Sequence, residues 1–191
     1  MLRHLTLFLV ALALAAGCAG TSPSPTPEET TLTAVGQLAP DFTVETLDGG
    51  TFTLGEQRGQ VVLVNWFATW CPPCQEEMPH LQSEVWEVFR DQGLVLVSVA
   101  REETAEVVRP FIQKYAVTWP FLLDPDRSAY ARYAEAFIPR NHVIDREGRI
   151  IFQSSGFERE DFEEMIGVIR AALSPQEGAP RMEERQEGQT E

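Results

Sequence analysis

The chain has 191 residues, a length that suits one domain of ordinary size with additional terminal segments. Hydrophobic residues make up 43% and charged residues 23%, a globular composition that excludes disorder along the whole chain. The formal net charge is −14, which argues against a nucleic-acid partner and against electrostatic docking on anionic lipid. The three cysteines, at positions 18, 71 and 74, are too few for a disulfide scaffold.

Residues 1–17 have the pattern of an export signal. A short basic start precedes an apolar run from Leu5 to Ala16, which is shorter than the about 20 residues that a transmembrane helix needs. Small residues then lead to Cys18, an ending that resembles a bacterial lipoprotein signal. We expect Cys18 to be acylated and the protein to be an exported, membrane-anchored lipoprotein facing the periplasm or the cell exterior. Ordinary cleavage, which would leave Cys18 as a spare thiol, is the alternative.

Composition also separates the tails from the domain. Residues 18–35 are rich in Ser, Thr and Pro without an apolar period, which predicts a flexible tether. Residues 174–191 are rich in Glu and poor in apolar side chains, which predicts a disordered acidic tail. The folded domain is therefore expected over residues 36–173.

Strands and helices are expected to alternate through this domain. The first part is predicted to form a hairpin of Asp41–Val44 and Thr51–Leu54, a buried strand Val61–Phe67, and a helix from Cys71 to Gly93 that is kinked at Pro79. A buried strand Leu94–Ala100, a helix Glu102–Tyr115 broken or kinked at Pro110, and a strand Phe121–Leu123 follow. The last part is predicted to form a short helix Ser128–Ala136, a hairpin of Asn141–Ile144 and Ile150–Gln153, and a final amphipathic helix that ends near Leu173. This order implies an α/β fold with a mixed central sheet covered on both faces and an added N-terminal hairpin.

Two thiols lie where the first buried strand gives way to a helix, in the segment Trp70-Cys71-Pro72-Pro73-Cys74. A C-x-x-C pair at a helix start can close a disulfide within one turn. The unpaired N–H groups and the dipole of the helix stabilise a thiolate on Cys71, which is expected to be the exposed thiol. Cys71 would attack a substrate disulfide, and Cys74, one turn further, would resolve the mixed disulfide.

Other uses of the cysteine pair are weaker. A zinc site would need two more ligands, and His80, His142 and Cys18 are not paired at metal-ligand spacing, so we expect no metal. A purely structural disulfide would close a loop too short to contribute much stability.

Two neighbouring features leave alternatives open. Glu77 follows Cys74 by three residues on the same helix face, so it is either the base that deprotonates Cys74 or an ordinary solvated residue. Ile138-Pro139 precedes a strand. The peptide bond between them is either cis, which would place the main chain of this segment against the thiols, or trans in an ordinary turn, which is the commoner form of X–Pro bonds in folded proteins.

From Gln37 to Leu173 the chain resembles the TlpA/ResA family of membrane-tethered, thioredoxin-fold thiol–disulfide oxidoreductases, within the AhpC/TSA-redoxin superfamily. The resemblance is carried by APDFTVETLDGGTFTL, GQVVLVNWFATWCPPCQEEMPHL, FLLDPD and IPRNHVIDREGRI. It implies a thioredoxin-like fold, a redox disulfide Cys71–Cys74 with Cys71 as nucleophile and Cys74 as resolving thiol, Glu77 as a buried acid/base, and a cis bond before Pro139.

The resemblance also implies a substrate groove beside the thiols, which we expect to be formed by Trp70, Pro72, Pro73, Ile138 and Arg140. Two departures concern this region. Asn65 stands where thioredoxin has a buried Asp, so a proton relay would use Glu77 instead. Arg140-Asn141-His142 replaces the family's usual Thr-Thr-Phe, which would place the Arg140 cation beside the groove.

The expected function is an extracytoplasmic protein-disulfide reductase for exported proteins, with apocytochrome c in cytochrome c maturation as one substrate. It would need no cofactor, take electrons from a membrane thiol donor, and act as a monomer. A peroxiredoxin-like thiol peroxidase is the alternative, although Ala68 stands where that chemistry needs Thr or Ser. A copper-binding module using the cysteines with His80 or His142 is a weaker one.

Overall fold

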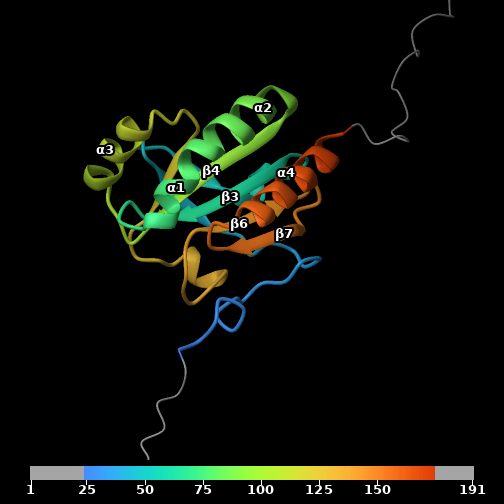
Figure 1. The fold of residues 1–191 in the computed structure, drawn as a ribbon, viewed down its shortest axis with the longest axis horizontal. Coiled ribbons are helices and arrows are strands. Elements are labelled where there is room, and N and C mark those ends of the chain that lie inside the picture. Colours follow the sequence, from blue (N-terminus) through green and yellow to red (C-terminus); the bar gives the residue numbers. More distant parts are fainter. Residues whose placement is uncertain (1–23, 175–191) are drawn as a thin grey trace, which may run out of the picture.

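The computed structural model describes residues 24–174 (Figure 1). Seven strands form one sheet in the order β2-β1-β5-β4-β3-β6-β7. Their bounds are β1 Thr43–Thr46, β2 Thr51–Thr53, β3 Val61–Phe67, β4 Leu94–Arg101, β5 Phe121–Asp124, β6 Arg140–Ile144 and β7 Ile150–Ser155. The three central strands β3, β4 and β5 are parallel and the other pairs are antiparallel, so the expected mixed sheet is confirmed. The proposed signal segment, Cys18 and the acidic tail from residue 175 onward lie outside the described residues.

Helices connect the parallel strands and close the chain. The α-helices are α1 Pro72–His80, α2 Glu87–Phe89, α3 Ala105–Tyr115 and α4 Arg159–Leu173; η1 Leu54–Gln57, η3 Arg90–Gln92 and η4 Tyr130–Arg132 are single 3₁₀ turns, and η2 Leu81–Trp86 is a π-helical segment. Pro110 lies inside an unbroken α3. Within residues 24–174 no helix combines the length and the apolar character needed to cross a membrane.

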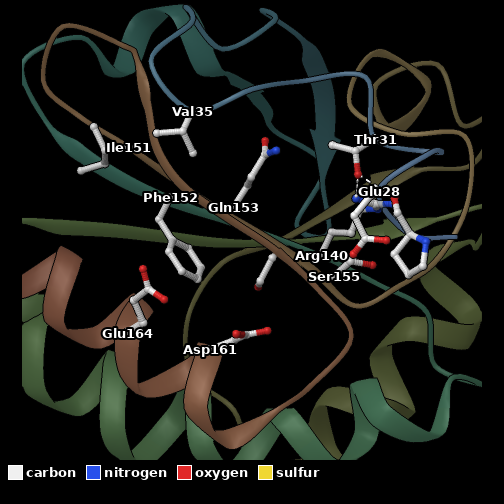
Figure 2. Close-up of a pocket in the computed structure, with 12 residues that line it drawn as sticks. Glu28, Thr31, Val35, Arg140, Ile151, Phe152, Gln153, Ser155, Asp161 and Glu164 are labelled. Carbon is white, nitrogen blue, oxygen red and sulfur yellow. Dashed lines mark hydrogen bonds between the residues drawn. The ribbon is translucent and has the colours of Figure 1, made fainter.

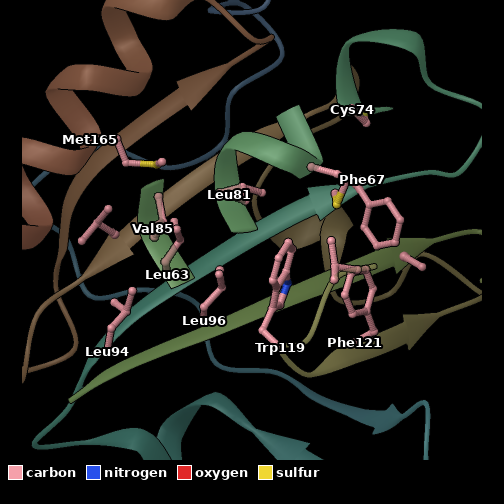
Figure 3. Packing of buried hydrophobic residues seen from close by; sticks show 14 of the residues in the cluster. Leu63, Phe67, Cys74, Leu81, Val85, Leu94, Leu96, Trp119, Phe121 and Met165 are labelled. Carbon is pink, nitrogen blue, oxygen red and sulfur yellow. The ribbon is translucent and has the colours of Figure 1, made fainter. Parts of the chain in front are cut away.

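One face of the sheet carries the α-helices (Figure 1). The crossovers from β3 to β4 and from β4 to β5 run in the same direction across the sheet, so α1 and α3 pack on the same side. The final helix α4, after β7, packs on this side as well. Figure 3 shows this core, in which Leu63 and Phe67 of β3 meet Leu81 and Val85 from the first helical stretch. Met165 of α4 completes the same cluster.

Within residues 24–174, no α-helix packs on the opposite face. Trp66 and the other β3 side chains that point to this face pack there against Phe42, Tyr130 and Tyr133. The predicted helix Ser128–Ala136 is therefore wrong in length, because the segment forms only the turn η4 and contributes two large aromatic rings to this second core. A few aromatic side chains cover the sheet here without a long helix.

The structure also corrects the boundary of the tether. Residues 26–35, which we call the strap, pack on the domain, although their composition predicts a flexible segment. Thr30 and Thr33 are buried, and Thr31 forms a bridge with Ala134. Their hydroxyls and main-chain groups are used in hydrogen bonds to the domain, an arrangement that composition alone does not reveal.

Candidate active site

The two cysteines lie at the junction that the sequence predicts. β3 ends at Phe67, three residues form a turn, and Cys71 is the N-cap of α1. Cys71 and Cys74 form a disulfide with a Cα–Cα distance of 5.2 Å. The Cys74 N–H donates to the Cys71 sulfur at 3.3 Å, so the helix start directs a main-chain donor at this atom.

The loop before β6 covers the disulfide from outside. The Ile138-Pro139 peptide bond is cis, as the resemblance implies, and the Ile138 carbonyl oxygen lies 3.6 Å from the Cys71 Sγ atom. Cys71 keeps 3% of its surface exposed and Cys74 none. Cys71 is thus the more accessible sulfur, as expected, but the oxidised pair is more sheltered than an exposed thiol.

Glu77 is fully buried one turn beyond Cys74 on α1. Its Oε2 atom accepts a hydrogen bond from the Asn65 side-chain amide at 2.9 Å, and its Oε1 atom accepts one from Asn141 at 2.5 Å. The reading of Glu77 as a solvated helix residue is therefore wrong. Burial raises the pKa of Glu77 to about 7, and the hydrogen bonds from Asn141 and Asn65 oppose part of this rise.

A chain of buried side chains continues from the carboxyl group across the sheet. The Asn65 amide also donates to the Asn141 oxygen at 3.0 Å. The Ser98 hydroxyl donates to the Asn65 oxygen at 2.8 Å, and the Trp119 indole N–H donates to Ser98 at 2.9 Å. Asn65, Asn141 and Ser98 come from β3, β6 and β4, so three strands together hold one carboxyl group of α1.

The turn before Cys71 is held from two sides. The Glu103 carboxylate, from the segment after β4, accepts from the Thr69 N–H at 2.8 Å and from its hydroxyl at 2.5 Å. On the other side, the Gln75 side-chain amide donates to the Thr69 carbonyl at 2.7 Å. These bonds fix the turn that presents Trp70.

Most of the residues expected to form the groove are at least partly exposed. Trp70 is 62% exposed, Pro72 is exposed, and Pro73 and Ile138 are half-buried near the disulfide. Phe137, which we did not predict, adds a second exposed ring at 41%. Its position two residues before the cis-proline was the available signal.

Arg140 is not part of the groove, contrary to our expectation. Its side chain is only 2% exposed and lies on the sheet face opposite α1. Side chains alternate along β6, so Arg140 and His142 point to one face and Asn141, between them, points to Glu77 on the other. Arg140 and Thr31 instead border a pocket of about 420 Å³ between the strap, β7 and α4 (Figure 2), which neither cysteine lines.

The described residues offer no clustered metal ligands. Within residues 24–174 no three His, Cys, Asp or Glu side chains are grouped to hold an ion. His80 pairs with Glu84, whereas His142 is fully buried beside Thr33 and Tyr133 in the second core. The copper-binding alternative therefore finds no histidine beside the cysteine pair.

Known proteins with similar sequences support this chemistry. A family model described as the AhpC/TSA family matches residues 35–153. The chain is 31% identical over 143 residues to the thiol-disulfide oxidoreductase ResA of Geobacillus kaustophilus, an alignment that covers 74% of this chain and 82% of that protein. It is 28% identical over 136 residues to ResA of Bacillus anthracis, covering 71% and 77% of the two chains.

Solved structures show the same fold. A Bacteroides thetaiotaomicron protein, whose assignment as a protein disulfide isomerase is provisional, superposes with a TM-score of 0.73 at 35% identity and covers 75% of this chain and 92% of its own. A thiol:disulfide interchange protein of the thioredoxin family from Chlorobium tepidum superposes with a TM-score of 0.61 at 26% identity, covering 74% and 99%. The expected thioredoxin-like architecture is confirmed.

Proposed function

Since this chain belongs to the AhpC/TSA family, and within it to the ResA-type thiol–disulfide oxidoreductases, we propose that it reduces disulfide bonds of other proteins. One observation carries the proposal most directly. A redox pair at a helix start is followed, one turn later, by a buried carboxyl group whose two oxygens are held by Asn65 and Asn141. This arrangement supplies both a nucleophile and a proton acceptor.

The first step forms a mixed disulfide. In the reduced protein the Cys71 thiolate attacks one sulfur of the substrate disulfide, and the other substrate sulfur leaves as a thiolate. The Cys74 N–H, which donates to the Cys71 sulfur, favours negative charge at this atom. Trp70 and Phe137 provide the exposed apolar surface against which the substrate chain lies.

The second step releases the substrate. Glu77 takes the proton of the Cys74 thiol, directly or through water, and the resulting thiolate attacks the Cys71 sulfur. The second substrate sulfur leaves as a thiol once it gains that proton, and the protein keeps the Cys71–Cys74 disulfide. A pKa of about 7, caused by burial, lets Glu77 both accept and return a proton near neutral pH. An external dithiol then restores the reduced pair.

The composition of the helix start supports reduction of the substrate as the direction of electron flow. Pro73 has no N–H and offers one donor fewer to a Cys71 thiolate, and Glu76 adds negative charge to the same helix. A less stabilised thiolate makes a more reducing pair. A thiol peroxidase is disfavoured because Ala68, buried and without a hydroxyl, occupies the position where that chemistry needs Thr or Ser.

Trapping the mixed disulfide tests the proposal. The reduced full chain is mixed with insulin, and reduction of insulin is followed with dithiothreitol as electron source. We expect C71S to be inactive and C74S to accumulate a covalent adduct through Cys71, visible by mass spectrometry without reductant. Turnover of hydrogen peroxide without reduction of insulin would reject the proposal in favour of the peroxidase.

We further propose that the protein works outside the cytoplasm, held to a membrane by a lipid on Cys18. The apolar run that ends in Ala16-Gly17-Cys18 supports this location, and the family resemblance suggests that haem-binding cysteines of apocytochrome c are substrates. In a bacterial host, the mature protein should carry an acylated N-terminal cysteine, and C18S should release it from the membrane fraction. Unchanged membrane association of C18S would contradict the anchor.

A further inference from the structure

The strap, residues 26–35, is joined to the segment that leads into the cis-proline loop. The Leu32 N–H donates to the Tyr133 carbonyl at 2.9 Å, and the Glu135 N–H donates to the Thr30 carbonyl at 2.8 Å. These bonds pair the strap with residues 133–135. The next three residues, 136–138, form the loop that faces the Cys71 sulfur, so the strap and the loop are neighbours through the main chain.

Arg140 adds a second connection from the strap side. Its Nη1 atom donates to the Thr31 hydroxyl at 2.7 Å, and its Nη2 atom donates to the Pro27 carbonyl at 2.9 Å and to the Thr30 hydroxyl at 3.0 Å. Figure 2 shows Thr31 beside the guanidinium, with the hydrogen bond between them dashed. Among residues 24–174 no carboxylate forms an ion pair with Arg140. The buried cation thus depends on neutral oxygens for its solvation, and the strap supplies three of them.

The same guanidinium holds the loop. The Arg140 Nε atom donates to the Ala136 carbonyl at 3.0 Å and to the Phe137 carbonyl at 3.1 Å. The Tyr130 hydroxyl donates to the same two carbonyls at 2.7 and 2.5 Å. Phe137 has a φ of 66°, a left-handed conformation that a residue with a bulky side chain adopts only when its surroundings impose it. These donors therefore maintain an otherwise unfavourable loop conformation.

We propose that Arg140 and the strap position the loop of residues 136–138 for substrate binding, so that the strap is a working part of the substrate groove. The inference rests on the proposed function, because this loop presents Phe137 and the Ile138 carbonyl beside the reactive sulfur. Arg140 acts through the loop and touches neither sulfur, which makes it a positioning residue. The strap also connects the groove to the part of the chain before residue 26.

The test removes the two strap hydroxyls while keeping side-chain shape. In the full chain we compare T30V/T31V with T30S/T31S, which keeps the hydroxyls, and with T43V, which removes an exposed hydroxyl that bonds Thr53 between β1 and β2. R140M is a harsher variant that also removes the donor. Each protein is assayed with two substrates: insulin, which must lie along the groove, and the small disulfide reagent 5,5′-dithiobis(2-nitrobenzoate).

We expect T30V/T31V to raise the KM for insulin roughly five-fold, because Arg140 loses two of its acceptors and holds the loop less firmly. The kcat, the rate with the small reagent and the reduction potential should not change. T30S/T31S and T43V should match the wild type. Backbone NMR order parameters of Phe137 and Ile138 should fall in T30V/T31V and in R140M, and should keep their wild-type values in T30S/T31S and T43V. An unchanged KM, or an equal loss with both substrates, would overturn the proposal.

The order parameters keep this test separate from the proposed function. If the wild type reduces neither disulfide, the proposed function fails by itself. The NMR measurement then decides whether the strap positions the loop. Order parameters of Phe137 and Ile138 that are as high in T30V/T31V as in T43V would reject this positioning.

Discussion

At the scale of single residues, the environment of Glu77 bears on its proposed role as the proton acceptor for Cys74. The carboxyl group is fully buried, and each of its oxygens accepts a hydrogen bond from an asparagine amide. Burial disfavours the charged form, while the two amides stabilise it. In the proposed mechanism, the balance of these effects decides the pH at which Glu77 takes the proton of Cys74.

Replacing Asn141 should shift that balance. In N141T the amide donor to Glu77 is lost, so the pKa of Glu77 should rise, and the pH dependence of the resolving step should move upward by about one pH unit. S98A is the control, because it removes a hydroxyl from the same network without removing a donor to the carboxyl group. The measurement is the rate of release of a preformed mixed disulfide between pH 5 and 9. Identical pH profiles for N141T and S98A would contradict this account.

The sequence reveals part of this site and misses the rest for definite reasons. Cys71, Cys74 and Glu77 are close in sequence, so their relation follows from helix geometry. Asn141 comes from a distant strand, and its contact with Glu77 depends on the order of the strands. Alternation along β6 puts Asn141 on the same face as Val143 and Arg140 on the other, but β6 is buried on both faces, so the sequence does not tell which face the helices cover.

At the scale of the elements, two helical prolines have different consequences. Pro79, near the end of α1, is followed by the π-helical segment η2, so the helical hydrogen-bond pattern changes where the sequence predicts a kink. Pro110 is exposed inside α3, whose apolar face stays packed on the core. The strands and the long helices were predictable from hydrophobic period, whereas these local adjustments and the short turn η4 depend on tertiary packing.

Replacing Pro110 should stabilise the protein. In P110A the new N–H can join the hydrogen bonding of α3, and the poor helix propensity of proline is removed, which together should raise the free energy of unfolding by about 1–2 kcal/mol. P120A is the matched control, because Pro120 lies outside the helices and its loss mainly adds freedom to the unfolded chain. Urea titration compares the three proteins. A destabilised P110A would show that α3 requires the proline.

At the scale of the whole molecule, each of the two cores buries an ionisable side chain. Glu77 lies on the helix-covered face and His142 in the second core. Burial lowers the pKa of His142 to about 3, with a smaller effect from the Arg140 charge, whereas burial raises that of Glu77 to about 7. Folding therefore releases a proton from His142 and takes one up at Glu77 in overlapping pH ranges.

The two groups should give opposite slopes of stability against pH. Glu77 has a raised pKa in the folded state, so its effect on the free energy of unfolding becomes less favourable as pH rises from 4.5 to 7. His142 has a lowered pKa, so its effect becomes less favourable as pH falls from 6.5 to 3. As pH is raised from 4.5 to 6.5, the free energy of unfolding of E77Q should increase by about 2 kcal/mol relative to that of the wild type. That of H142Q should decrease by about as much over the same range. Urea unfolding at several pH values measures both; parallel curves for all three proteins would contradict the assignment.

The reduction potential of the Cys71–Cys74 pair tests the central claim most directly. Equilibration of the full chain with dithiothreitol or glutathione buffers, followed by thiol quantification, gives the value. Thioredoxin lies near −270 mV and the strong oxidant DsbA near −120 mV. The proposed reductant should have a potential below about −220 mV, whereas a value above about −160 mV would make the protein an oxidant or isomerase and contradict the account.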